Sequence, residues 1–234
     1  MSKKAAYCDV DGTLTSGFYI KELCDALYKC GLFSGKEYMK SEDILSEYKK
    51  GNLKYTEAAP EAVKVFARGI RGRKKIDAQK VGEIYIAEHP EKIFTFTEGL
   101  ISKLRYKGYI PVLLSGSPEE IIMPFGRGFG ICEKDIFATQ FEAERGVYTG
   151  EVLRSMVEPG MKRSIAKSYA EMHGIDLAES AAFEDTENGV ELLDIVGHPI
   201  AIRPNSILEE IAIKREWPIC KTDEEVRETV KYIP

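Results

Sequence analysis

Near its start the chain reads Ala5-Ala6-Tyr7-Cys8-Asp9-Val10-Asp11-Gly12-Thr13-Leu14, a short apolar segment that runs directly into two carboxylates and a Gly-Thr turn. Side chains of a strand alternate between its faces, so Asp9 and Asp11 are predicted to project to the same side where a strand gives way to a loop. Two like charges so close repel each other and raise each other's pKa. A bound divalent cation, a proton-transfer role, or both would offset that cost.

Further short apolar segments alternate with helical patterns later in the chain, which predicts a parallel sheet with helices on both faces. Between residues 20 and 87 the apolar positions fall at helical spacing and no β-rich run interrupts them. We therefore expect an α/β fold, a three-layer doubly wound parallel sheet with an inserted all-helical cap of roughly four helices. The expected division is 1–17 and 92–234 for the catalytic core and 18–91 for the cap.

Three of the expected strands end on polar side chains. Asp9 and Asp11 follow the first strand, Ser115 follows Leu113-Leu114, and Glu184-Asp185 follow Ala181-Ala182-Phe183. In open α/β sheets the ligand lies beyond the carboxyl ends of the strands. These side chains are therefore expected to meet in one site.

The order of these residues resembles the haloacid dehalogenase superfamily. Asp9-Val10-Asp11-Gly12-Thr13 resembles its first motif, DxDGT; Ser115 its second; Lys162, in Gly160-Met161-Lys162-Arg163, its third; and Phe183-Glu184-Asp185-Thr186 its acidic fourth. The stretch 115–119 and the helical insert after the first motif are similar to the phosphoserine-phosphatase-like branch with a helical cap.

The resemblance implies a hydrolase for phosphoric monoesters. Asp9 would attack phosphorus and form an aspartyl-phosphate, and Asp11 would protonate the leaving alcohol and then deprotonate the attacking water. Lys162 would neutralise charge on the phosphoryl oxygens. Substrate binding is assigned to Ser115, Gly116, Phe18 and Tyr19, and supporting roles to Glu184, Thr13 and Asn188.

A divalent cation would reduce the repulsion between a dianionic phosphate ester and a carboxylate nucleophile. Mg²⁺ prefers hard oxygen ligands, and the sequence offers Asp9, Asp11 and Asp185, with a backbone carbonyl near Asp11 as a further donor. The expected cofactor is Mg²⁺ and the expected partner is a small phosphorylated metabolite.

The sequence departs from the phosphoserine-specific pattern at two places. Members that hydrolyse phosphoserine carry an acid a few residues past the DxDGT turn, where this chain has Ser16-Gly17-Phe18-Tyr19. An aromatic pair offers an ammonium group a cation–π contact but no charge, which argues against phosphoserine as the substrate. The fourth motif resembles a Glu-Asp-x-x-x-Gly variant, because Gly189 stands four residues after Asp185.

Composition excludes several other classes of protein. The 234 residues are 44% hydrophobic and 30% charged with a net charge of −5, which is typical of a globular domain and does not suggest nucleic acid as a partner. Five cysteines form no CxxC pair, so reduced thiols and a cytoplasmic location are expected. No apolar run reaches membrane-spanning length. The chain is expected to be a monomer or a homodimer.

Two other functions are compatible with the same residues. A phosphotransferase or phosphomutase would form the same aspartyl-phosphate and pass the phosphoryl group to an alcohol. A non-enzymatic protein that binds a phosphorylated ligand would use the scaffold alone, although binding does not require Asp9, Asp11 and Asp185 together.

Overall fold

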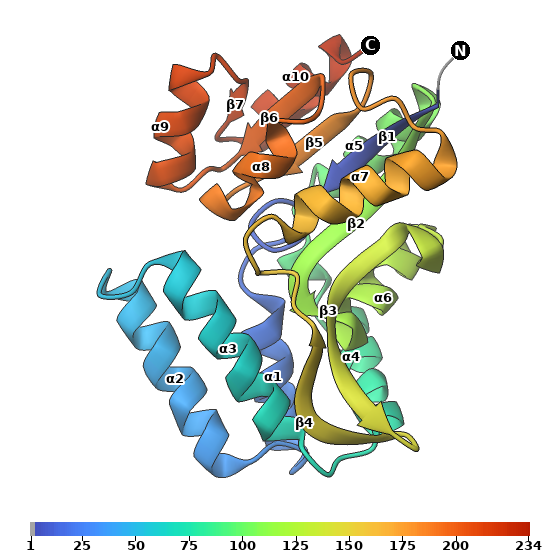
Figure 1. Ribbon diagram of the computed structural model, residues 1–234. Helices are drawn as coiled ribbons and strands as arrows, with labels where there is room; N and C mark the ends of the chain where they lie inside the picture. Colours follow the sequence, from blue (N-terminus) through green and yellow to red (C-terminus); the bar gives the residue numbers. More distant parts are fainter. Residues whose placement is uncertain (1–2) are drawn as a thin grey trace.

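The computed structural model describes residues 3–234 and has a seven-stranded sheet at its centre (Figure 1). The strand order is β4-β3-β2-β1-β5-β6-β7. All neighbouring pairs are parallel except β3 and β4, which form an antiparallel hairpin at one edge. The strands are β1 (Lys4–Cys8), β2 (Tyr109–Pro118), β3 (Ile136–Glu144), β4 (Val147–Arg154), β5 (Ala181–Glu184), β6 (His198–Ile202) and β7 (Ile219–Cys220).

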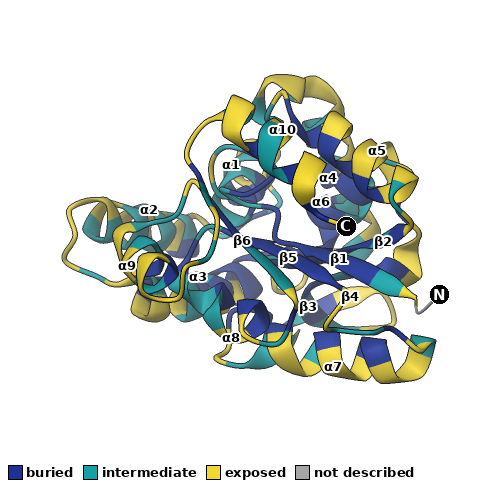
Figure 2. Ribbon diagram, turned by 90° about the horizontal axis from the view of Figure 1, so that it is seen from above, coloured by how far each residue is buried: buried dark blue, intermediate teal, exposed yellow. Residues whose placement is uncertain are grey.

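Helices cover both faces of the sheet, which confirms the predicted α/β fold (Figure 2). The helices are α1 (Tyr19–Lys29), α2 (Gly35–Lys49), α3 (Tyr55–Ile70), α4 (Lys75–Glu88), α5 (Thr97–Tyr106), α6 (Glu119–Gly128), α7 (Met161–His173), α8 (Val190–Leu193), α9 (Ser206–Lys214) and α10 (Asp223–Tyr232). Three short 3₁₀ turns lie at Pro90–Lys92, Glu133–Asp135 and Glu187–Gly189.

The core is divided between the two faces of the sheet, as the alternation of side chains along β1 requires. Ala6 and Cys8 face the cluster that includes Leu104 of α5 and Phe125 of α6. Ala5 and Tyr7 face a second cluster, formed largely with α7, α8 and α9. In Figure 2, β1 and β5 are dark blue between these helical layers. A strand buried on both faces positions the residue that follows it rigidly.

Helices α1 to α4, which follow β1, match the predicted helical segment. Helices α1, α2 and α3 lie beside one another at one end of the molecule, whereas α4 packs along α6 (Figure 1). The β3–β4 hairpin extends toward the same end, where β4 packs on α3. The boundaries at 17/18 and 91/92 stay a prediction, since the contacts of α4 and β4 join the two parts.

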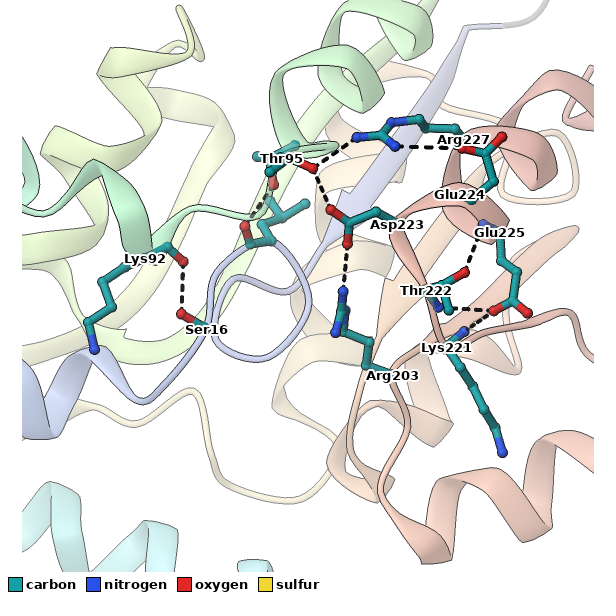
Figure 3. A network of polar contacts seen from close by, with 12 residues as sticks. Ser16, Lys92, Thr95, Arg203, Lys221, Thr222, Asp223, Glu224, Glu225 and Arg227 are labelled. Atoms are coloured by element: carbon teal, nitrogen blue, oxygen red, sulfur yellow. Dashed lines mark hydrogen bonds and ion pairs between the residues drawn. The ribbon is translucent and has the colours of Figure 1, made fainter.

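The two chain crossings between the helical segment and the sheet lie side by side. The backbone N–H and the hydroxyl of Ser16 both donate to the carbonyl oxygen of Lys92, at 2.7 and 3.2 Å. Just beyond, Thr95 and Arg203 both bond to Asp223, at the start of α10 (Figure 3). This polar network ties the second crossing to the C-terminal helix.

Within residues 3–234 no helix combines the length and the apolar character needed to cross a membrane. All five cysteines, Cys8, Cys24, Cys30, Cys132 and Cys220, are free thiols.

Candidate active site

The first motif leaves β1 in a tight turn. The backbone N–H of Asp9 donates to the carbonyl oxygen of Phe183 on β5 at 3.0 Å, which continues the ladder one residue past the strand. Gly12 then adopts a φ of +77°, a conformation that favours glycine. Asp9 and Asp11 both reach the same pocket, as their spacing predicted.

The fourth motif lies beside the first because β5 pairs with β1 in parallel, with Phe183 opposite Cys8. Carboxylate oxygens of Asp9, Glu184 and Asp185 lie within 4.8 Å of one another. A Cβ atom on Gly12 would lie 1.9 Å from Oδ2 of Asp185, so the glycine makes room for that carboxylate against the turn. Two segments that are far apart in the sequence thus form one acidic cluster.

Lys162 supplies the positive charge of this cluster from the first turn of α7. Its Nζ lies 2.9 Å from Oδ1 of Asp9 and 2.8 Å from Oε2 of Glu184, and its side chain is 5% exposed. Burial alone would lower the pKa of Lys162, but the charges of Asp9 and Glu184 outweigh it and hold the pKa above its usual value. Lys162 therefore stays protonated.

Glu184 is fully buried and receives two hydrogen bonds from Lys162, at 3.0 and 2.8 Å. Burial raises the pKa of its carboxyl group against the opposing effect of Lys162. A Cβ on Gly189 would lie 2.3 Å from Cδ of Glu184. The glycine of the variant fourth motif is thus the residue that leaves space for Glu184.

Asp185 has a different environment from Glu184. Its Oδ1 is buried and finds no hydrogen-bond partner within the described residues. Burial and the charges of Asp9 and Glu184 raise the pKa of its carboxyl group well above the usual range. A positive charge would give the unpartnered Oδ1 of Asp185 a ligand and would offset the repulsion that raises the pKa of this carboxyl group. The carboxylate beside Asp9 therefore suits a hard divalent cation. The donor set of these two residues is therefore suited to Mg²⁺.

Asp11 faces hydrogen-bond donors in place of a cation. Its carboxylate accepts from the backbone N–H of Tyr19 at 2.6 Å and from the hydroxyl of Ser115 at 3.2 Å. Burial, followed by the charge of Asp9, raises the pKa of Asp11 to about 6. Its side chain is not part of the acidic cluster that Asp9 forms with Glu184 and Asp185. Asp11 is thus a carboxyl group that can carry a proton near neutral pH and that is held by neutral donors.

The second motif supports the site through two serines on one face of β2. Ser115 is fully buried and its hydroxyl points to Asp11, whereas Gly116 and Ser117 line the pocket. The hydroxyl of Ser117 accepts from the backbone N–H of Ile20 at 2.9 Å and so fixes the start of α1. Sequence reasoning did not single out Ser117, although its spacing of two from Ser115 places both on the same face.

The aromatic pair after the first motif separates. The ring of Phe18 lines the pocket and packs edge-on against Tyr48. The ring of Tyr19 instead packs in the core against Tyr85 and Phe125, so Tyr19 contributes to the site through its backbone N–H.

Tyr55, at the start of α3, approaches the site from the cap. Its hydroxyl lies 3.6 Å from the place of a Cβ on Gly116. Burial and the charges of Asp9 and Asp185 raise the pKa of Tyr55, while Lys162 opposes them. Tyr55 is thus a cap side chain that lies close enough to the site for these charges to act on it.

The supporting residues lie around this centre. Thr13 is fully buried in the turn of the first motif, and its hydroxyl is without a partner among the described residues. Asn188 lies half-buried on the 3₁₀ turn after Asp185. Asn205 was missed by sequence reasoning; its backbone N–H donates to the carbonyl oxygen of Asp185 at 2.8 Å. The loop after β6 thereby holds the fourth motif in place.

Comparison with known proteins agrees with this geometry. The family model of haloacid dehalogenase-like hydrolases matches residues 6–194. The chain belongs to this family, which confirms the resemblance to the haloacid dehalogenase superfamily. It is an enzyme of the phosphatase type that its relatives represent.

Relatives with described activities include two phosphoserine phosphatases. One from Mycobacterium tuberculosis is 26% identical over 223 residues, which cover 92% of this chain and 70% of that protein. One from Methanocaldococcus jannaschii is 28% identical over 183 residues, which cover 77% of this chain and 82% of that protein. A substrate-bound phosphoserine phosphatase structure has the same fold, with a TM-score of 0.71, 21% identity and complete coverage of both chains.

Proposed function

We propose that this chain is a Mg²⁺-dependent phosphatase that hydrolyses a small phosphate monoester through an aspartyl-phosphate on Asp9. The proposal rests on the different environments of two neighbouring carboxyl groups, those of Asp9 and Asp11. Asp9 is paired with Lys162 at 2.9 Å, whereas Asp11 is held by neutral donors and has a pKa raised to about 6. A nucleophile must be ionised and a general acid must hold a proton.

In the first step an oxygen of Asp9 attacks phosphorus and the bond from phosphorus to the ester oxygen breaks. Asp11 gives its proton to the departing alcohol oxygen. Lys162 lies against Asp9 and would bond to a phosphoryl oxygen, which offsets charge on the transferring group. Ser117, Gly116 and Tyr55 lie around the same opening and would position the remaining oxygens.

In the second step a water molecule attacks the phosphoryl group on Asp9. Asp11, now ionised, takes a proton from that water, the bond from phosphorus to Asp9 breaks, and inorganic phosphate leaves. Asp11 is thereby protonated again and Asp9 is regenerated as a carboxylate. The hydrogen bonds from Ser115 and Tyr19 keep Asp11 in one orientation for both proton transfers.

Asp9, Asp185 and the backbone carbonyl of Asp11 would hold the Mg²⁺ ion. When bound, the ion supplies positive charge that reduces the repulsion between the phosphate ester and the carboxylates. Glu184 has both oxygens engaged by Lys162 and serves to position that lysine.

The test is release of inorganic phosphate from p-nitrophenyl phosphate by the full chain, with Mg²⁺ and with EDTA. Asp9→Asn is expected to lower kcat by about 10⁴-fold or more, the scale on which removal of a covalent nucleophile acts. Acid quenching of the wild type during turnover should trap a phosphorylated chain that mass spectrometry detects. Turnover of Asp9→Asn at the wild-type rate would refute the assignment of the nucleophile.

Asp43→Asn is the matched control, because Asp43 is an exposed aspartate on α2 outside the pocket lining. It should retain the wild-type rate. Adding an acceptor alcohol separates hydrolysis from phosphotransfer, since a phosphotransferase would yield a phosphorylated alcohol in place of inorganic phosphate.

A further inference from the structure

The pocket that begins at Asp9 and Asp185 continues into the space between α1, α2 and α3. Its cavity has a volume of about 100 Å³, which is room for several water-sized groups beyond the acids. A phosphoryl group at the acids would occupy one end of this space. The rest of the pocket is therefore available to the alcohol part of the ester.

The walls of this extension are apolar at helical spacing. On α3 the lining residues include Tyr55, Ala59, Ala62 and Phe66, which follow one face of the helix. From Tyr55 to Phe66 the helix advances about 16 Å at 1.5 Å per residue. The facing walls carry further apolar side chains: Phe18 and Ile20 before and in α1, and Ile44, Leu45 and Tyr48 in α2.

The charged groups near this extension already have partners. Beyond the aspartates at its mouth, Lys21 is the one charged side chain that lines the pocket within residues 3–234, and it is paired with Asp25 and Glu42. Glu22 pairs with Lys92 at 3.2 Å and lines a different cavity, between α1 and α4.

Arg68 is likewise unavailable to a ligand in this pocket. It pairs with Glu37 at 3.0 Å and with Glu61 at 3.1 Å, and it does not line the pocket. A carboxylate or an ammonium group on the substrate would thus be buried without a partner, which is strongly unfavourable.

We propose that the substrate is the phosphate monoester of an alcohol with an uncharged, apolar body that lies between α1, α2 and α3. The inference rests on the proposed phosphatase function and adds the class of leaving group. The alcohol oxygen lies at Asp11 and the apolar body extends past Phe18 and Tyr55. Small residues on the α3 wall, Ala59 and Ala62, leave the width that such a body needs.

The dependence of kcat/KM on the length of the substrate's alkyl chain tests this proposal. Each methylene group buried in an apolar pocket is expected to raise kcat/KM about fourfold. Ethyl, butyl and hexyl phosphate should therefore form a rising series that spans roughly 10²-fold. Phosphoserine and phosphoethanolamine should not exceed ethyl phosphate. Benzyl phosphate distinguishes a preference for a ring from one for a linear chain, and either preference agrees with the proposal.

The outcomes separate the two proposals. The inference would be overturned if at least one ester released phosphate but phosphoserine were preferred over hexyl phosphate, or if the rate did not depend on the length of the alkyl chain. The phosphatase function would then still stand. The absence of release from every ester, including p-nitrophenyl phosphate, would overturn the phosphatase function and the inference with it.

A substitution in the α3 wall of the pocket tests where the alcohol part of the ester lies. Ala62 is half-buried and lies two turns beyond Tyr55, about 10 Å along α3. Ala62→Phe should lower the ratio of kcat/KM for hexyl over ethyl phosphate by about 10-fold or more, because it fills the far part of the pocket.

Ala26→Phe is the matched control, since Ala26 is a half-buried alanine of α1 that lines the other cavity. Thermal unfolding of both variants checks that each is folded. An unchanged hexyl-to-ethyl ratio in folded Ala62→Phe would contradict the proposed position of the alcohol.

Discussion

Replacing Lys162 with methionine should destabilise the protein and abolish phosphate release by two separable routes. The side chain of Lys162 is 5% exposed, and its Nζ contacts Asp9 at 2.9 Å and Glu184 at 2.8 Å. Methionine retains the packing of the aliphatic stem but removes the cation. Asp9, Glu184 and Asp185 would then share one buried cluster with no positive charge from the protein.

The size of the expected loss of stability follows from the buried carboxylates that would remain without a positive partner. Breaking a buried ion pair by removing one partner costs about 3–5 kcal/mol, because the remaining charge is buried and unpaired. With a urea m-value of about 2.5 kcal/mol/M, the midpoint of unfolding should fall by about 1–2 M. Glu184→Gln removes one of the stranded carboxylates, so the double variant should regain about half of the loss.

The assay is urea unfolding followed by circular dichroism at pH 7 in EDTA, which keeps divalent cations from replacing the missing charge. Lys167→Met is the control, because Lys167 is an exposed lysine on the same helix, and it should change stability by less than about 0.5 kcal/mol. Phosphate release should stay absent in the double variant even though stability returns. A Lys162→Met protein within about 1 kcal/mol of wild type would refute the reasoning.

Three further predictions concern other buried groups. Asp185→Asn should abolish the increase in melting temperature that Mg²⁺ gives the wild type, because it removes the orphaned carboxylate; an equal increase in the variant would contradict the metal site. Gly189→Ala should lower the free energy of unfolding by about 1–3 kcal/mol, since the new Cβ meets Glu184; unchanged urea unfolding would argue against that contact. Burial raises the pKa of Glu120, whose carboxylate accepts from Tyr148. The wild type should therefore lose stability relative to Glu120→Gln as pH rises above about 4.3, and a pH-independent difference in melting temperature would refute this.

The sequence was sufficient to predict the elements whose signals are local. The buried strand before Asp9 and the run of helices that follows it both occur, because strand alternation and helical periodicity act within a few positions. The meeting of Asp9 with Glu184 and Asp185 also followed from the rule that ligands lie at the carboxyl ends of parallel strands.

What the sequence left open depends on contacts between distant segments. Nothing in Phe18-Tyr19 indicates that one ring lines the pocket while the other enters the core, because that choice depends on Tyr48 and Phe125. The pairing of Glu22 with Lys92 joins residues 70 positions apart and has no local signal. The packing of the β3–β4 hairpin on α3 could not be predicted either, because contacts between distant elements leave no periodic pattern in the sequence.

The two aspartates of the first motif differ because different elements surround them. Asp9 lies toward β5 and α7, which bring Glu184, Asp185 and Lys162, so its environment is dominated by full charges. Asp11 lies toward β2 and α1, which bring a hydroxyl and a backbone N–H, so its environment is dominated by neutral donors and burial. A carboxylate that is to attack and one that is to carry a proton need those two environments respectively. The position of β1 between β2 and β5 supplies both environments within a span of three residues, so under the proposed mechanism we expect neither aspartate to take over the role of the other.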